Sequence, residues 1–527
     1  MILIARVSPA IDSAGTVRTM LFGSVDWTTG PADTPANEPV RGRLVEGGNY
    51  KRDLGAGQSL FGQVRPSYGV AKIRITGGAL DALARYGWGW RTYELWGYEN
   101  DGYQALPAFP SGWTLLFSAV VESAQCSESE LTLTLKDPLA LLTKPVCTQY
   151  GGTGGLDGIA AMAGTAKPRL YGMACNVQPV LLDSTTNIYQ LSDKTASQAR
   201  WVYDRRVALT PTSNSYNDAV DFPALQALAV AAGAYARCAD AGIFKLNSTP
   251  AGALTVDGIR HSGSYATAYG RSRFGEVVSD IATDAGLTSG QVDSALTAID
   301  TAGGASLGYY VRDLSTTYLD VLGVIAASRG AWVGCNRLGQ LTGAVVTAPS
   351  GSPVWTFRPG NSLTLARVDG AYPVPLRQAT VRGGRNWTPM QASDLAGSVP
   401  ATDLERLRDG YGYAEVSTGS AAAQHLNAPD EVFETSSGSV GLVSPGLPGA
   451  TVGVTASSIV ALFGVARDTI EVSCQLTTAL LAAVDLGSVV RVQWPRFNLD
   501  AGKLMRCIGV RLNFGAGSGR ATFVLWG

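Results

Sequence analysis

Alternating apolar and polar residues indicate β-strands in the first part of the chain. In 131–137 (LTLTLKD), three leucines face one side while two threonines and a lysine face the other, which is typical of a half-buried strand. Segments 91–98 and 114–121 have the aromatic and apolar composition of strands. Polar residues 122–130 separate two of these strands and predict an antiparallel hairpin with an extended loop.

The last segment of the chain repeats this pattern. Residues 507–514 (CIGVRLNF) alternate, the glycine-rich turn 515–520 follows, and 521–527 (ATFVLWG) alternate again. On the closing strand, one face is expected to carry Ala521, Phe523 and Leu525, and the other Thr522, Val524 and Trp526. Further strands are predicted at 469–476 and 486–494, and a loop at 442–453.

Both ends of the chain therefore close with two alternating strands joined by a polar loop. This shared pattern predicts two related β domains at 1–150 and 355–527, although the two segments share negligible sequence identity.

Helical periodicity is confined to a few segments. Apolar residues recur at three and four positions in 273–286 and in 315–330, which end at Gly286 and Gly330. Ser315 or Thr316 is the expected N-cap of the second helix.

Two further helices are shorter. One is predicted at 78–87 with Gly87 as its stop, and one at 455–468 with an apolar face of Ile459, Leu462, Phe463 and Ala466.

The middle of the chain divides into two predicted domains. Residues 166–260 consist of short strands and turns, and the glycine-rich 151–165 before them is a boundary or loop, so 151–260 is taken as a β-rich domain. The two helices and the hairpin 331–346, with its turn at 336–339, form a small α+β domain at 261–354.

Charge and composition narrow the class of protein. The 527 residues include 46% apolar and only 16% charged residues, with a net charge of −1. There is no electrostatic basis for binding nucleic acid or an anionic membrane. The low charge fits a chain that buries much of its surface in an assembly. The start of the chain lacks the features of a signal peptide, and the longest apolar stretch, 224–236, is too short to span a bilayer.

Seven cysteines are widely spaced and form no C-x-x-C pair. They are interpreted as scattered, buried thiols in a reducing compartment; an iron–sulfur or metal site made by four distant cysteines remains the alternative. The seven are Cys126, Cys147, Cys175, Cys238, Cys335, Cys474 and Cys507.

The two histidines, His261 and His425, lie in no recognisable catalytic motif. His261 is interpreted as a loop residue and His425 as lying on a helix or at its end. A zinc site would need more histidines or clustered cysteines.

Charged and glycine-rich segments are also interpreted as structural. The cluster 403–410 (DLERLRDG) is an ion-paired helix face, although carboxylate pairs for glycoside cleavage stay open in a chain with 42 acidic residues. Residues 99–102 form a turn rather than a calcium loop, and 151–165 lacks the Lys-Ser/Thr ending of a phosphate loop.

Five aromatic residues gather in 88–98. Core packing and subunit contact are favoured for them, with saccharide or nucleic-acid stacking as the alternative. They are Trp88, Trp90, Tyr93, Trp96 and Tyr98. No catalytic, cofactor-binding or metal-binding residue is predicted.

One set of motifs resembles a known family. Residues 167–183 (KPRLYGMACNVQPVLLD), followed by IYQLSD and WVYDRRVALT, are similar to a recurrent segment of the tail-tip, or baseplate hub, proteins of long-tailed phages and of the related gene transfer agent hub protein. The matching residues are Lys167, Pro168, Tyr171, Gly172, Asn176, Val177, Pro179, Tyr189, Gln190, Val202, Tyr203, Asp204 and Val207. Arg206 stands where glycine is commoner, so a different turn is expected there. Segments 67–96, 315–341 and 486–527 also resemble parts of this family, and 355–450 resembles it least.

The resemblance implies a fold and a role. The fold would be α+β, mostly β and multidomain, with two related β-barrel-like tube domains flanking a β-rich and a small helix–helix–hairpin domain. The chain would be a non-enzymatic virion protein, assembled in the host cytoplasm as a homotrimer whose β domains form a pseudo-sixfold ring.

The implied partners are other tail components. They are the distal tail protein and tail tube ring, the tape-measure protein and the central tail fibre, with genomic DNA only in transit through the lumen and no stable membrane association. In this reading 166–183 is scaffold that stiffens the connection between two domains. A tail-associated cell-wall or capsule hydrolase and a receptor-binding tail spike remain as alternatives.

Overall fold

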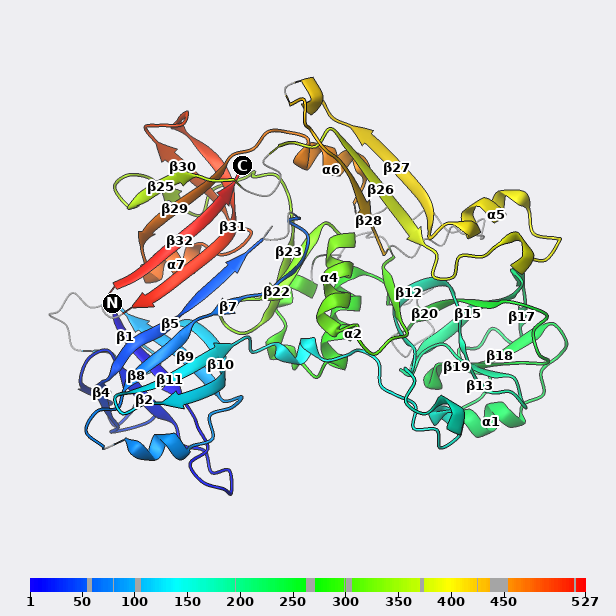
Figure 1. Ribbon diagram of the computed structural model, residues 1–527, viewed down its shortest axis with the longest axis horizontal. Coiled ribbons are helices and arrows are strands. Elements are labelled where there is room, and N and C mark those ends of the chain that lie inside the picture. Colours follow the sequence, from blue (N-terminus) through cyan, green and yellow to red (C-terminus); the bar gives the residue numbers. More distant parts are fainter. Residues whose placement is uncertain are drawn as a thin grey trace. The chain divides into compact units, whose positions relative to one another are not determined.

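The computed structural model shows a mostly β, multi-sheet protein that divides into two units (Figure 1). The first unit comprises Met1–Ala140, Trp332–Pro373 and Ala466–Gly527, and the second comprises Leu141–Ala331 and Val374–Val465. The structure describes all residues except 55–58, 79, 100–105, 195, 262–270, 298, 300–305, 370–373, 424, 437–453 and 516–517.

The first unit is built on one long sheet that contains strands from both ends of the sequence. In spatial order the main path is β25 (Thr364–Arg367), β29 (Thr469–Gln475), β32 (Ser518–Trp526), β31 (Leu499–Gly515), β5 (Leu44–Asp53), β8 (Val70–Arg74), β11 (Glu130–Lys136), β10 (Thr114–Cys126), β9 (Thr92–Tyr98), β1 (Ile2–Val7), β2 (Met20–Gly23), β4 (Pro39–Gly42) and β3 (Trp27–Thr28). The branches are β24 (Thr356–Phe357), β30 (Val489–Trp494) and β7 (Ser67–Tyr68).

The antiparallel pair β5–β31 joins the two ends of the chain. Its register places Asp53 opposite Gly509 and Asn49 opposite Asn513. The rings of Phe117 and Phe514 pack 5.6 Å apart across this junction. Pairings among the described strands form an open, branched path, so the closed barrel that the resemblance implied is not seen in this part of the chain.

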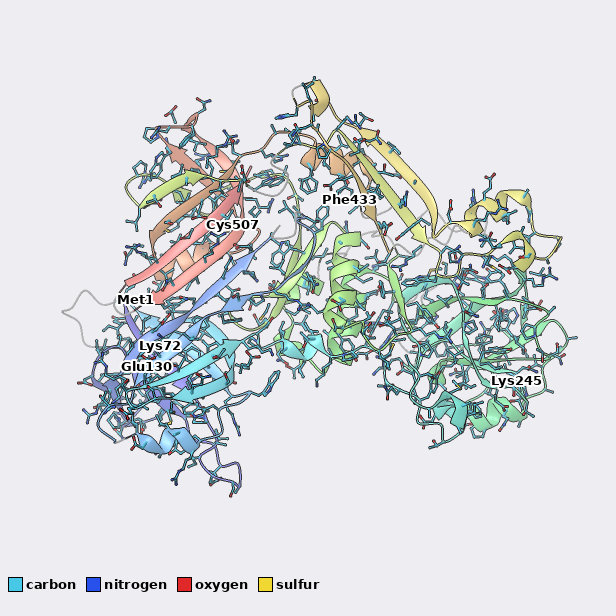
Figure 2. All side chains as sticks on the ribbon, viewed as in Figure 1. Met1, Lys72, Glu130, Lys245, Phe433 and Cys507 are labelled. Carbon is cyan, nitrogen blue, oxygen red and sulfur yellow. The ribbon has the colours of Figure 1, made fainter. Side chains whose placement is uncertain are left out.

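The predicted alternation is confirmed in the N-terminal hairpin. Leu131, Leu133 and Leu135 are buried on one face of β11. On neighbouring strands, Lys72 Nζ of β8 lies 3.9 Å from Glu130 Oε1 of β11, and Figure 2 labels both residues.

Two details of this region differ from the prediction. The extended loop at 122–130 is wrong: β10 continues to Cys126, because a bulge between Val121 and Ser123 restores its pairing with β11, and backbone pairing prevails over the polar composition. The helix predicted at 78–87 is a short 3-10 helix, Asp81–Arg85. Gly87 does not end it; its backbone instead pairs with that of Ala10.

The C-terminal strands are found where expected, but with different bounds. β31 begins eight residues earlier than the predicted 507–514, because its first part pairs with β30. Helix α6 (Ala456–Phe463) ends at Gly464, so the predicted face residue Ala466 lies outside the helix. Helix α7 (Thr478–Ala483) was not predicted. The turn at 515–520 includes positions outside the described residues, and the loop at 442–453 lies wholly outside them.

The second unit contains two five-stranded sheets. One consists of β16 (Val207–Ala208), β15 (Ser197–Asp204), β20 (Leu254–Arg260), β12 (Arg169–Val177) and β21 (Gly308–Val311). The other consists of β13 (Val180–Asp183), β14 (Ile188–Gln190), β19 (Ile243–Leu246), β18 (Ala234–Cys238) and β17 (Thr210–Pro211). Leu170, Val202, Phe244 and Val256 are among the residues that form a shared apolar core from strands of both sheets.

Three smaller groups complete the two units. In the second unit, β26 (Gln378–Arg385) lies between β27 (Tyr411–Thr418) and β28 (Asp430–Glu434), and α6 packs on β26 and β27. Helices α1 (Phe222–Ala227), α2 (Phe274–Asp284), α3 (Ser294–Thr297), α4 (Tyr318–Ser328) and α5 (Ala401–Arg408) also belong to it. In the first unit, β22 (Ala331–Cys335) lies between β23 (Leu341–Val345) and β6 (Gly62–Val64).

The predicted helices α2 and α4 are confirmed, and each is followed by a glycine with positive φ. The N-cap of α4 is Thr317, not Ser315 or Thr316, because Thr317 completes a capping box with Asp320. The hairpin β22–β23 is also confirmed, but from Trp332 onward it belongs to the first unit, whereas both helices belong to the second. The four-domain division stays a prediction.

Candidate functional site

The motif that carries the family resemblance forms buried structure. Every residue of β12 is buried, in a central position of its sheet, so 169–177 is a core strand as well as scaffold and not only a stiff connection. Gly172 has φ 61°, and a Cβ there would lie 2.0 Å from the carbonyl oxygen of Leu307. Only glycine satisfies both constraints.

Five side chains of the second unit meet in a buried polar cluster, here named the Asn176 cluster. It consists of Asn176, Tyr203, Arg206, Asp257 and Asn386. Asn176 adopts φ 55° at a bulge of β12 and donates its backbone N–H to Asp257 Oδ1 over 2.7 Å. Its Nδ2 donates to Asn386 Oδ1 over 2.8 Å. The cluster thereby links β12 to the segment that follows β26.

The cation of this cluster comes from a strained turn. Asp204 and Val207 pair directly, which leaves Arg205 and Arg206 as a two-residue hairpin turn with φ of 48° and 67°. This geometry normally favours glycine or asparagine. Arg206 occupies it with a buried side chain whose guanidinium lies 3.8 Å from the ring centroid of Tyr203. At Arg206 the chain therefore has a tight two-residue turn with a buried charge; whether this turn differs from that of the family stays a prediction.

The Asn176 cluster contains a buried ion pair, Arg206 and Asp257, in which Arg206 is only partly hydrogen-bonded. Arg206 Nη1 lies 3.8 Å from Asp257 Oδ1, and Arg206 Nε and Nη2 have no hydrogen-bond partner. Burial raises the pKa of Asp257, an effect that Arg206 opposes. These groups hold backbone segments together, and they include no nucleophile with an adjacent base.

A second buried network surrounds Arg169 of β12. Arg169 Nη2 donates to Asp193 Oδ2 over 2.8 Å and its Nη1 to Asp284 Oδ2 over 3.2 Å. Tyr171 donates its hydroxyl to the same Asp284 oxygen over 3.0 Å. Arg260 extends the network to Asp284, with Nη1 3.4 Å from Oδ2. This network ties α2 to β12 and β20.

The first unit has a single comparable cation among the residues that the structure describes. Arg52 of β5 donates from Nη1 to the carbonyl oxygen of Cys335 over 2.9 Å and from Nη2 to Asp485 Oδ1 over 2.6 Å. It also lies 5.3 Å from the ring centroid of Trp332. Arg52 therefore joins β5 to β22 and to the residues before β30.

The two histidines are not brought together with a nucleophile. His261 directly follows β20 and is buried, with Nε2 2.7 Å from Gln198 Oε1. Burial lowers its pKa, and the nearby Arg200 and Arg237 lower it further. His425 follows a 3-10 helix, and its backbone N–H donates to the carbonyl of Ala421 over 2.8 Å, as expected for a residue at a helix end.

Six of the seven cysteines are buried and only Cys126 is exposed. Burial raises the pKa of Cys147 and of Cys474 to about 12, so both thiols are protonated at neutral pH. Within the described ranges, no group of three or more His, Cys, Asp or Glu side chains is placed to bind a metal ion.

The remaining candidates form no shared site. Residues 403–408 lie on α5 as predicted. Among the described residues, the carboxylates of Asp403, Glu405 and Asp409 do not form the ion pairs expected of this helix face. Glu405 and Asp409 line an open polar hollow of about 430 Å³. The turn at 99–102 lies mostly outside the described residues.

The glycine-rich segment 151–165 is a loop, as predicted. Asp157 organises it by accepting bonds from the backbone of Gly151 over 2.9 Å and from Lys167 Nζ over 2.8 Å. The Asp157 carboxylate thus accepts from the backbone and side-chain donors of this loop that a bound anion would otherwise need.

The aromatic cluster at 88–98 separates into core and surface residues. Trp88 and Tyr93 are buried, and Trp96 and Tyr98 pack at the edge of a core cluster. Trp90 differs, because it is 61% exposed and has φ 61°.

Comparison with known proteins gives structural matches only. No family model matches the chain, and no curated protein matches it. Similar solved structures include the 43 kDa tail protein of prophage MuSo2 from Shewanella oneidensis, at 9% identity and a TM-score of 0.41, covering 100% of this chain and 98% of that one. A tail protein from Neisseria meningitidis MC58 matches at 9% identity and a TM-score of 0.39, covering 99% of this chain and 96% of that one.

A gene transfer agent virion also contains a similar chain. It matches at 14% identity and a TM-score of 0.39, over 69% of this chain and 84% of that one. All three structures are described as tail or virion proteins. Among the described residues, no helix has the length and apolar character needed to cross a membrane.

Proposed function

We propose that this chain is a structural protein of a phage tail tip, the baseplate hub that closes the tail tube. The observation that carries the proposal is the β5–β31 pair, which fuses strands from both ends of the sequence into one sheet. A ring subunit must transmit force across its full width without separating, and continuous backbone pairing supplies that resistance. The ordered motifs of 167–207, whose strand β12 is wholly buried in the second unit, support the same assignment.

In this proposal the chain works mechanically. Three copies surround the lumen, and each contributes two β lobes from the sheet of its first unit. The ring contacts the distal tail protein and the tail tube, holds the tape-measure protein and the central fibre, and opens for DNA ejection. It resides in the virion after assembly in the host cytoplasm, and it performs no catalysis.

Trp90 supplies a candidate subunit contact. Its backbone is fixed, because its N–H donates to the carbonyl of Val121 over 2.7 Å, while its side chain is mostly exposed. A bulky residue with positive φ is conformationally strained, and such strain gathers at functional positions. Exposed tryptophan is also enriched where protein surfaces meet.

The experiment is a residue-level reconstruction of tails from the phage or agent that encodes this chain. We expect three copies at the tail tip, with Trp90 against another subunit. Six equal copies in one ring would contradict the trimer, and absence of the chain from purified tails would contradict the virion role.

A matched pair of variants tests the contact. Trp90→Ala should leave the stability of the monomer unchanged and reduce the yield of complete tails. Val17→Ala, at a 49% exposed position of the same unit, should change neither quantity. Equal tail yields for both variants would exclude Trp90 from the interface.

The hydrolase alternative is tested on cell walls and capsule. Tails carrying both His261→Gln and His425→Gln, which removes both imidazoles, should assemble and infect nearly as well as wild-type tails. A wall-cleaving activity of wild-type tails that this double variant abolishes would replace the structural proposal.

A further inference from the structure

His261 lies directly after β20, at one end of the β16–β15–β20–β12–β21 sheet. Its backbone N–H donates to the carbonyl of Ala196 over 2.8 Å, and its Nε2 lies 2.7 Å from Gln198 Oε1. Its ring packs edge-on against Tyr216, with centroids 5.2 Å apart. Since an amide oxygen only accepts, Nε2 carries the proton and Nδ1 carries the lone pair. The side chain thus joins β20 to the start of β15 and to the loop before α1.

The second ring nitrogen of His261 makes no hydrogen bond to any described residue. His261 Nδ1 is buried without a hydrogen-bond partner. Tyr216 Oη, on the ring that packs against His261, is also buried without a partner among the described residues. Buried polar groups without partners are rare in folded proteins, so this pair marks an unusual site.

The charges that face His261 are cationic. Arg200 approaches from β15 and Arg237 from β18, and both disfavour a positive imidazole. Two carboxylates act on the neighbours of His261, and both are hydrogen-bonded. Asp218, which pairs with Arg237, accepts the backbone N–H of Arg237 at Oδ2 over 2.8 Å, and Asp240, which acts on Tyr216, accepts from Asn217 Nδ2 at Oδ2 over 2.6 Å.

On its own strand, the neighbouring Arg260 is occupied too. Its Nε lies 3.1 Å from Asp280 Oδ2 on α2. No element packed around His261 therefore offers a free negative charge among the described residues.

We propose that His261 is an acid-sensitive latch of the 166–260 region. The neutral ring holds the ends of β15 and β20 together, and protonation opens them, because the cation would have an unpaired N–H beside two guanidinium groups. This device is independent of the proposed tail function and requires no partner.

The direction of the pH effect follows from the lowered pKa of His261. The unfolded chain binds this proton at an ordinary pKa of about 6.5, whereas the folded chain binds it only at lower pH. The contribution of neutral His261 to stability is therefore complete above about pH 6.5 and is lost as the pH falls toward the folded-state pKa. A single proton changes the opening equilibrium by at most about tenfold per pH unit.

Hydrogen exchange on the full-length protein tests the latch. After correction for intrinsic exchange rates, peptides covering 196–204 and 254–261 should open progressively between pH 7 and pH 5. The variant His261→Gln, which retains an N–H for Gln198 but does not titrate, should remove this pH dependence. His425→Gln is the matched control and should behave as wild type.

Two results would overturn the proposal. One is pH-independent opening of these peptides in the wild type, and the other is unchanged pH dependence in His261→Gln. If His261→Gln fails to fold, histidine-selective NMR of the wild type decides, because the chain has only two histidines. A His261 midpoint at or above about 6.5 would exclude the latch, and a lower midpoint is expected.

Discussion

The two units use different interactions to hold distant parts of the sequence together. In the first unit, Asp53 pairs with Gly509 through the backbone, and the long sheet needs few buried charges. In the second unit, smaller sheets are joined by buried side chains, as where Asn176 Nδ2 donates to Asn386 Oδ1 over 2.8 Å. Backbone pairing is nearly independent of side-chain identity, whereas a side-chain junction depends on each residue in it.

This difference predicts where substitutions cause damage. The first unit should resist polar substitutions on its outer face and fail when its apolar face is charged. The second unit should be sensitive at a few polar positions that lie outside its apolar core. The predictions below follow this contrast from the largest expected effect to the smallest.

The largest effect is expected in β32 of the first unit. Phe523 is fully buried, so Phe523→Asp places an unpaired charge in the core and should cost at least about 4 kcal/mol of unfolding free energy. Thr522→Asp should be much milder, because Thr522 is only partly buried beside Arg511 on the opposite face. Denaturant unfolding of both variants gives the comparison. Equal losses of unfolding free energy in the two variants would show that both faces of β32 are equally buried.

A smaller but still large effect is expected in the Asn176 cluster. Arg206→Gly relaxes the positive φ but leaves the buried Asp257 without its cation, for a net loss of about 2–4 kcal/mol. Asp257→Asn in the same background should restore part of this loss, because it removes the uncompensated charge. A double-mutant cycle from denaturant midpoints measures the coupling. Strictly additive effects would mean that the two groups do not interact.

The bulge residue Asn176 separates backbone from side-chain effects. Asn176→Gly keeps the φ of 55° and loses the hydrogen bonds, whereas Asn176→Ala also strains the backbone. We expect losses of about 1–3 kcal/mol, with alanine worse than glycine by about 1 kcal/mol. Thermal unfolding distinguishes them, and a glycine variant less stable than alanine would argue against backbone strain.

The smallest effect is expected at an exposed pair in the second unit. Arg377 Nε lies 2.7 Å from Asp430 Oδ1, but both side chains are solvated. Asp430→Asn should leave the denaturant midpoint unchanged within error, since exposed ion pairs contribute little. A clear loss would show that surface pairs also hold this unit together.

Local patterns in the sequence predicted the elements but not their partners. The leucine alternation of β11 and the apolar spacing of α2 each reflect burial on one face, so both were found. The pairing of β5 with β31 was not found, because register between strands more than 450 positions apart leaves no local signal. The single sheet that joins both ends of the chain therefore required the structure.

The buried polar residues illustrate a second limit. Tyr203 and Asn176 were singled out through a family resemblance, but nothing in their neighbourhood indicated that they meet Asp257. Arg206 was noted only as a departure from glycine. A charged residue in a turn is typically exposed, so its burial reverses the usual expectation. The interpretation of His261 as a loop residue is confirmed, but nothing in its sequence neighbourhood indicates that it is buried.

The β5–β31 pair also sets the order in which the first unit is completed. Ribosomes deliver β5 several hundred residues before β31, so β5 waits with one edge unpaired until synthesis is almost finished. An unpaired edge is a template for aggregation. A chain truncated before residue 509 lacks the partner for that edge, so only chains that extend through Gly515 have β5 fully paired when they enter an assembly.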